Sequence, residues 1–371
     1  MGAKKLAIAG PGTGKTTFLV KEAADALSAD DCHGIIISTF TRKAAKELNE
    51  KIREEISDNE AVQSKNILTG TIHSVCYQLL NLYLDDPAHS IIDETKLINF
   101  IYARIDALGF DAQEHNKSLI QIASDMQVIF GWLTDLEADI ASLNLDEPYI
   151  NDIITAYSRY KRILKRNNLY DFATIQEKTL DQLERNNEFK EMIHSNYNYF
   201  FIDEFQDVNN IQNKIFKCLG SGDNNLCVVG DDDQSIYGFR GADRSQIINF
   251  ENTYDGVEKI ELFNNYRSTK NIVDASNYLI SITHQERLDK NIVSYRSGPN
   301  FNGCEISLKS FNSDADEYEF IAKQINELVE KYGFNFSEIA ILMASVKRNN
   351  KIIEETFNKY SIPYNFSALG G

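Results

Sequence analysis

The sequence predicts an α/β fold built on a parallel β-sheet, with a long all-helical insertion. Three observations indicate this. Short apolar or β-branched runs alternate with helical patterns over residues 6–80 and again from 197 to about 281. Polar motifs directly follow several of these runs, as at the carboxyl edge of a parallel sheet. Between 81 and 196 the apolar residues recur instead with helical spacing, and strand signals are few.

The first strand-like run leads into a glycine-rich loop at residues 9–16, with the sequence AGPGTGKT. A helical pattern follows, which completes the strand–loop–helix context of a phosphate-binding loop, although Ala9 replaces the usual outer glycine. Glycines let backbone N–H groups converge on phosphate oxygens, and the helix N-terminus adds partial positive charge. Lys15 would reach the β and γ phosphates, and Thr16 would ligate Mg²⁺. The candidate nucleotide-binding residues of the loop are Gly10, Gly12, Thr13, Gly14, Lys15, Thr16 and Thr17.

A second nucleotide-site motif follows the strand-like run at 197–202, which ends in Asp203 and Glu204. Two acids at the carboxyl end of a strand form a Walker B pattern. Asp203 would hold the Mg²⁺ shell, and Glu204 would orient or deprotonate the attacking water. Acid pairs after strands are also common in surface turns. Together with a phosphate-binding loop in the same domain, the pair becomes a strong signal for a nucleotide site that holds Mg²⁺.

Composition excludes several classes of protein. The formal net charge of −17 argues against binding nucleic acid through the overall field, but a local basic groove stays compatible with it. Five scattered cysteines show no metal-ligand spacing, which predicts free thiols in a reducing cytoplasm. Apolar runs are too short to span a membrane. The basic stretch 159–166 fits a solvated helix face or a phosphate-contacting one equally well.

The last hundred residues show a second α/β pattern. Strands are expected at 304–309 and 339–343, with a helix between them that has Tyr318, Ile321 and Ile325 on one face. This second pattern looks unfinished where the sequence ends.

Taken together, the motifs resemble those of UvrD/Rep/PcrA-like superfamily 1 DNA helicases, from the first residue to the last. The matching stretches occur in the family's order: AGPGTGKT, TFTRKAA, TGTIHS, DEFQD, VVGDDDQSIYGFRGA and NYRST. The resemblance implies a first RecA-like motor domain from residues 1–80 plus 197–270. It also implies a helical insertion domain at 81–196 and the start of a second, truncated RecA-like domain at 271–371.

The resemblance also implies an ATP-dependent translocase that moves along single-stranded or partly duplex DNA, in the 3′→5′ direction. Lys15, Glu204, Gln234 and Arg267 would be the catalytic residues. Gln234 would sense the γ-phosphate, and Arg267 would be an arginine finger that neutralises charge on the transferred phosphoryl group. Tyr266 would stack on adenine.

Two groups of residues match the family's DNA contacts. Aromatic rings at Phe40, Tyr237 and Phe239 would stack on bases, which is tolerant of sequence because every base has a π face. Arg42, Lys43, His73 and Arg240 would contact the backbone or the bases beside them. Stacking does not read the 2′-OH, so RNA stays an alternative to DNA.

Two departures from the family pattern lead to an alternative. A glutamine-containing motif that reads adenine is expected about twenty residues before the phosphate-binding loop, and the sequence starts too late to hold it. The later motifs, including a second arginine finger, are also not found. The alternative is therefore a nucleotide-binding fragment or interaction module of a split helicase, in which a partner chain supplies the missing motifs. On either interpretation, the isolated chain is expected to hydrolyse ATP poorly.

Overall fold

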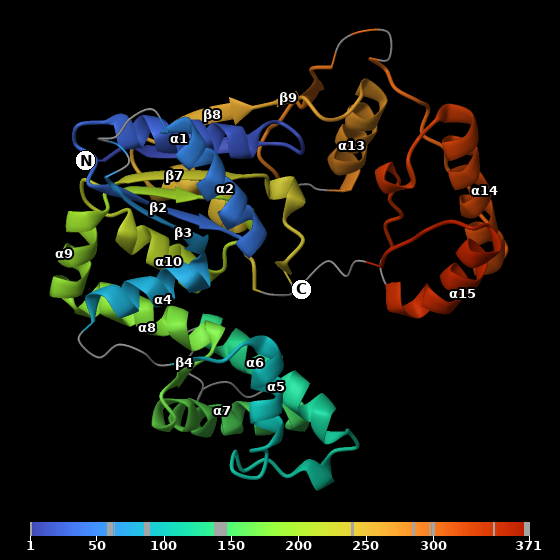
Figure 1. Ribbon diagram of the computed structural model, residues 1–371. Coiled ribbons are helices and arrows are strands. Elements are labelled where there is room, and N and C mark those ends of the chain that lie inside the picture. The colour runs from blue at the N-terminus through green and yellow to red at the C-terminus, as the bar shows by residue number, and fades with distance from the viewer. Residues whose placement is uncertain are drawn as a thin grey trace. The chain divides into compact units, whose positions relative to one another are not determined.

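A computed structural model describes residues 2–57, 62, 64–84, 90–136, 147–238, 241–283, 286–296, 298, 301–343 and 346–366, without the side chains of 135, 136 and 346–348. The chain divides into two compact units, residues 1–303 and 304–371 (Figure 1). Among the described helices, none is both long and apolar enough to cross a bilayer.

The first unit contains a six-stranded parallel sheet with the strand order β3-β2-β6-β7-β1-β8 (Figure 1). The strand that precedes the glycine-rich loop, β1, lies between β7 and β8, so its carboxyl end is flanked by two other strand ends. The strands are β1 (Lys4–Ala9), β2 (Gly34–Thr39), β3 (Asn66–Thr71), β6 (Tyr199–Ile202), β7 (Asn225–Gly230) and β8 (Glu258–Leu262).

Both faces of this sheet are buried, because successive residues of a strand point to opposite faces. In β1, Leu6 and Ile8 belong to one hydrophobic core, while Ala7 and Ala9 belong to the other. Helices α1 (Lys15–Ser28) and α2 (Arg42–Glu55) cover the Ala7 face. The opposite face is covered by α4 (Ile72–Tyr83), α8 (Phe172–Arg185), α9 (Asn187–Asn196), α10 (Asn210–Leu219), α11 (Ser245–Ile248) and α12 (Phe250–Thr253).

The helical insertion has its own hydrophobic core over only part of its expected length. Helices α5 (Glu94–Tyr102), α6 (Leu119–Leu136) and α7 (Pro148–Arg166) form that core, and β4 (Ser90–Ile91) pairs with β5 (Leu169–Tyr170). Helices α8 and α9 pack on the sheet instead. A capping box at Asp171, whose carboxylate accepts from the Thr174 N–H, starts α8 at the point where the chain returns to the sheet.

The first unit continues past residue 270, where the second motor domain was expected to start. Helix α13 (Lys270–Thr283) is followed by β10 (Val293–Ser294), which pairs in parallel with β9 (Asn264–Asn265). Leu288 belongs to the core on the α4 side of the sheet. These contacts attach the segment 271–303 to the first unit.

In the second unit, helix α14 (Asp314–Tyr332) is confirmed, with Tyr318 and Ile325 buried against α15 (Val346–Lys359). The prediction of strands at 304–309 and 339–343 is wrong, because the structure has no helix or strand at either place. A strand needs a neighbour for its backbone hydrogen bonds, and the described part of this unit contains no strand. Leu308 and Leu342 are accordingly 98% and 86% exposed.

Candidate nucleotide and nucleic-acid site

The glycine-rich loop has the backbone of a phosphate cradle. Gly12 and Gly14 adopt positive φ angles of 69° and 91°, which favour glycine, and Gly14 is the residue before the first turn of α1. The Thr13 hydroxyl is buried and closes the loop, because it donates to Gly10 O at 2.9 Å and accepts from Gly10 N at 3.1 Å. The exposed side chains of Thr16 and Thr17 follow at the start of the helix.

Asn265 connects this loop to the predicted arginine finger. Its buried carboxamide donates to Pro11 O and accepts from the backbone N–H groups of Arg267 (2.9 Å) and Ser268 (2.7 Å). Tyr266 N also donates to Gly12 O at 2.9 Å. A Cβ at Gly12 would lie 2.7 Å from Cβ of Arg267, so glycine is required for this approach. Arg267 therefore lies beside the phosphate-binding loop.

Lys15 and Glu204 meet across the site, from the ends of β1 and β6. Lys15 Nζ lies 2.9 Å from Glu204 Oε2, which also accepts from Gln206 Nε2 at 2.8 Å. Glu204 has a φ of 52°, an uncommon conformation for a residue with a Cβ, and such strain occurs preferentially at functional sites. The ammonium expected to hold phosphates is thus paired with the carboxylate of the predicted base.

The acids around Glu204 suit a divalent cation. One carboxylate oxygen of Asp203 and one of Asp207 are buried and have no hydrogen-bond partner among the described residues. Burial, with the Glu204 charge as the second cause, raises the pKa of each to about 6. Hard oxygen ligands are what Mg²⁺ prefers, so Asp203 fits the predicted metal role, with Thr16 on the loop. Asp207, which was not predicted, is a second candidate ligand.

Gln206 links this acid cluster to the predicted γ-phosphate sensor. Its side chain is 1% exposed, and its Oε1 accepts from the backbone N–H of Asp231 at 2.9 Å. The Asp231 carboxylate in turn accepts from Gln234 Nε2 at 2.6 Å. The ends of β6 and β7 are therefore joined by continuous hydrogen bonds.

A groove of about 270 Å³ runs from these acids to the predicted base-stacking residues. Asp203, Glu204 and Gln234 line one part of it, and Phe40 and Tyr237 line another. The two rings are 4.5 Å apart between centroids and tilted by 30°. Phe40 is 38% exposed, which is unusual for a phenylalanine and suits a ring that contacts a ligand. Phe239 and Arg240 lie outside the described residues.

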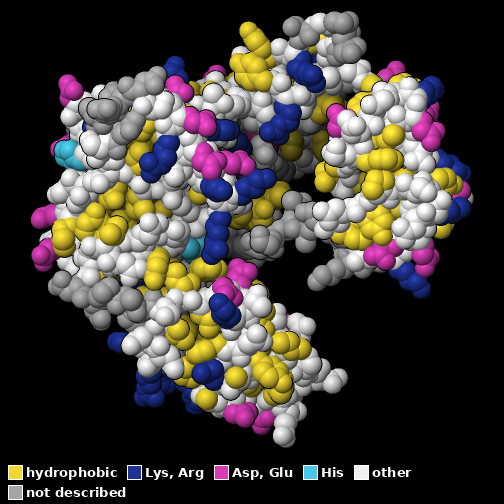
Figure 2. All heavy atoms as spheres, in the orientation of Figure 1, with side chains coloured by type: hydrophobic (Ala, Val, Ile, Leu, Met, Phe, Trp, Pro, Cys, Tyr) yellow, Lys and Arg dark blue, Asp and Glu magenta, His cyan; other side chains and the backbone are white. Residues whose placement is uncertain are grey.

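The predicted basic contacts differ in their surroundings. Lys43 is exposed and pairs only weakly with Glu47 within α2, at 3.9 Å. The His73 ring packs on Phe172, with centroids 4.7 Å apart. The positive charge of Arg42 contributes to lowering the pKa of His73. In the view of Figure 2, basic side chains of the first unit are interspersed with acidic ones. Any nucleic-acid contact on this face is thus local.

The basic stretch 159–166 lies within α7, and part of it is used inside the protein. Tyr160 is buried in the core of the helical insertion. Arg159 donates to Leu108 O at 3.1 Å, and Lys161 pairs with Glu177. A phosphate-contacting role for this helix face therefore stays a hypothesis.

Comparison with known proteins agrees with this geometry. Residues 1–255 match the model of the UvrD/REP helicase N-terminal domain, and residues 260–368 match the UvrD-like helicase C-terminal domain. The chain belongs to the UvrD/Rep helicase family. It is 33% identical over 377 residues to an ATP-dependent DNA helicase PcrA of Staphylococcus epidermidis, and 32% identical to one of Staphylococcus aureus. Each alignment covers 99% of this chain and 49% of the relative. The chain thus spans about half the length of the curated relatives it matches.

Family membership confirms the fold class, a mixed α/β protein with a parallel central sheet. Sequence reasoning missed several residues of this helicase-family site. Asp207 and Asn265 stand inside motifs that had been recognised, so their motifs were the available signal. Gln206 also lies in such a motif, but its link to Asp231 depends on the fold. Lys290, which contacts Asp232 at 2.6 Å, lies outside those motifs. The functional residues that were not predicted are therefore Gln206, Asp207, Asn265 and Lys290.

Replacing Asn265 with alanine should weaken nucleotide binding about tenfold and lower the melting temperature. The change leaves the Pro11 carbonyl and the backbone N–H groups of Arg267 and Ser268 without these partners, at a cost of about 1–3 kcal/mol. Fluorescent-nucleotide titration and thermal unfolding measure the two effects. The matched control is Asn264→Ala, which removes an exposed side chain from the same short strand. Equal behaviour of the two variants would contradict the role given to Asn265.

The His73 ring should make stability sensitive to acid. Burial, with the nearby Arg42 charge as a second cause, lowers the pKa of His73 to about 4, from an ordinary value of 6.5. Between pH 6.5 and 4 the unfolded chain therefore binds more protons, so folding stability is lost as the pH falls. Between pH 7 and pH 4.5 we expect His73→Gln to remove roughly 2 kcal/mol of this loss. Urea unfolding at pH 7 and pH 4.5 tests this, with the exposed His33→Gln as control. An unchanged difference between the two pH values would contradict it.

Proposed function

We propose that this chain is the ATP-hydrolysing, DNA-binding core of a helicase that moves along single-stranded DNA in the 3′→5′ direction. The observation that carries the proposal is the groove that joins Glu204 and Gln234 to the Phe40–Tyr237 ring pair. A change at the nucleotide phosphates can reach the base-stacking rings over one short stretch of chain, from Gln234 to Tyr237. The relatives are named ATP-dependent DNA helicases, which supports the same activity.

Each residue of the nucleotide site has a proposed role. The loop N–H groups and Lys15 would bind the phosphates, and Tyr266, which is 57% exposed, would stack on adenine. Asp203 and Thr16 would hold Mg²⁺, which neutralises phosphate charge when bound. Glu204 would take a proton from the attacking water once Lys15 turns from it to the phosphates. Arg267 would stabilise charge on the transferred group.

The second unit, with the segment from 271, is proposed as the start of a second RecA-like motor domain. ATP binding and hydrolysis would then be coupled to movement along the strand, with Phe40, Tyr237 and Phe239 holding bases in turn. His73, Arg42, Lys43 and Arg240 would add salt-sensitive contacts. The free cysteines support a cytoplasmic location. The second candidate is a nucleotide-binding module that acts with a partner chain.

The proposal is tested by the ATPase rate of this chain and of its full open reading frame, each with and without single-stranded DNA or RNA. Stimulation by DNA is expected, and Phe40→Ala with Tyr237→Ala should remove it while basal hydrolysis persists. A strand-displacement assay with 3′ and 5′ tails reports the direction. ATP binding without hydrolysis under all conditions would favour the interaction module. An equal response to RNA and DNA would overturn the choice of substrate.

A further inference from the structure

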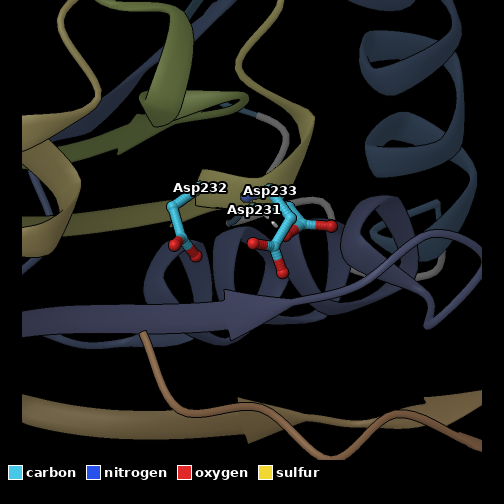
Figure 3. Close-up of side chains that lie close together, drawn as sticks. All are labelled: Asp231, Asp232 and Asp233. Atoms are coloured by element: carbon cyan, nitrogen blue, oxygen red, sulfur yellow. Dashed lines mark hydrogen bonds between the residues drawn. The ribbon is translucent and has the colours of Figure 1, made fainter. Parts of the chain in front are cut away.

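A lysine outside the motifs lies buried at the edge of the nucleotide site. The Lys290 side chain is 1% exposed, and lysine is almost never so buried unless it is paired. Its ammonium contacts Asp231, lies 2.6 Å from Asp232 and lies 2.7 Å from Asp233. These three aspartates form the loop directly after β7, and Figure 3 shows the carboxylates of Asp231 and Asp233 next to each other with Asp232 to one side.

The cation of this cluster is supplied by the chain itself. One oxygen of each aspartate lies within 4.8 Å of the others, a spacing that a divalent ion could also use. The Lys290 ammonium, however, is in contact with all three carboxylates. Arg287 donates two hydrogen bonds to Asp233, at 2.8 and 3.1 Å. Within the described part of the chain it makes no hydrogen bond to Asp231, on which only its charge acts. Lys290 and Arg287 therefore share Asp233, while Lys290 alone of the two holds Asp231.

Asp231 connects Lys290 to Gln234. One of its carboxylate oxygens accepts from Lys290, and the other accepts from Gln234 Nε2 at 2.6 Å. An ionised carboxylate only accepts hydrogen bonds, so the NH₂ end of the Gln234 carboxamide faces Asp231 and its oxygen faces away. That oxygen is the atom with which Gln234 can accept a hydrogen bond from a water.

We propose that Lys290 is a positioning residue for Gln234: its ammonium holds the Asp231 carboxylate, which sets the orientation of the Gln234 side chain. For its effect on ATP, the inference rests on the proposed function. Lys290 stands 23 residues beyond Arg267, in the segment between α13 and β10. The same contact thus attaches that segment to the loop that carries the sensor.

The orientation of Gln234 can be observed directly, by NMR of its side-chain amide in the nucleotide-free chain. Gln234→Ala assigns the signal by its disappearance. The wild-type amide should be ordered, and Lys290→Met should move it to the averaged position of an exposed glutamine. Arg287→Met is the matched control, because it removes a cation of the same cluster and leaves the hydrogen bonds of Asp231 intact. It should leave the signal in place. An unchanged signal in folded Lys290→Met overturns the proposal.

If Lys290→Met does not fold, NMR relaxation of the Gln234 side-chain amide in the wild type tests the proposal instead. A Gln234 side chain that rotates freely in the wild type overturns the proposal, and a rigid one that stays rigid in Lys290→Arg supports it. The functional measurement compares affinity for a non-hydrolysable ATP analogue with affinity for ADP. Gln234→Ala and Lys290→Met should each reduce the preference for the analogue about tenfold, and Arg287→Met should not.

The two measurements separate this proposal from the proposed function. A preference that falls in Gln234→Ala but not in Lys290→Met overturns the role of Lys290. A preference unchanged in Gln234→Ala overturns γ-phosphate sensing by Gln234, which belongs to the proposed function. In that case the NMR result still decides whether Lys290 orients the side chain.

Discussion

Lys15→Ala should reduce ATP hydrolysis by about a hundredfold or more and weaken ATP binding about tenfold to a hundredfold. The change removes the one side-chain cation of the glycine-rich loop, while the backbone cradle of Gly12 and Gly14 stays intact. The loss should therefore be larger for ATP than for adenosine, which carries no phosphate. Steady-state hydrolysis and fluorescent-nucleotide titration measure the two effects.

The control for this prediction is Lys21→Ala, on the same helix α1, with an exposed side chain. It removes the same charge at a distance from the loop and should leave both hydrolysis and binding unchanged. Hydrolysis that persists in Lys15→Ala would show that the activity comes from another site or a contaminant. A parallel loss in Lys21→Ala would instead show that net charge is responsible.

Glu204→Gln should separate binding from hydrolysis. Loss of a general base slows the chemical step by about 10²–10⁴-fold, and we expect hydrolysis to fall by that amount. ATP binding should be kept or become tighter, because Lys15 is then released from its 2.9 Å ion pair and is available to the phosphates. Single-turnover hydrolysis and equilibrium binding on the same preparation test both parts.

A suitable control for Glu204→Gln is Glu22→Gln. Glu22 pairs with Lys5 at 2.7 Å, so the substitution breaks a partly buried lysine–glutamate pair of similar length in a region remote from the chemistry. Its hydrolysis rate should match that of the wild type. If Glu204→Gln weakens ATP binding as strongly as it slows hydrolysis, Glu204 acts in binding and another group activates the water.

Motifs that depend on neighbouring residues could be predicted from the sequence. The loop at 9–16 requires glycine at its positive φ angles, and its place between a strand and a helix follows from local apolar patterns. The acids after β6 follow a strand-like run in the same way, whereas the role predicted for Gln234 after β7 came from the family resemblance. Parallel strands bring their carboxyl ends to one edge, so the meeting of Lys15 with Glu204 follows from the predicted sheet.

Strand pairing could not be predicted in the same way. The runs 304–309 and 339–343 have strand composition, but a strand forms only where another strand offers its backbone groups. The described part of the second unit has none. Likewise, α8 and α9 carry the same helical pattern as the rest of the insertion, and only their packing assigns them to the sheet.

By itself, the sequence of this helicase-family chain determined the glycine-rich loop and the acid pair, because each depends on a short stretch and its preferred backbone. The candidate stacking rings followed from the family resemblance of their motifs. Only the tertiary structure revealed the long-range contacts that hold these parts. Asn265 binds the loop at Pro11, Gln206 accepts from the backbone N–H of Asp231, and Lys290 contacts three aspartates. Their partners are up to 254 residues away in the chain. No local pattern marks such a pair, since its energy depends on burial and charge that exist only after folding.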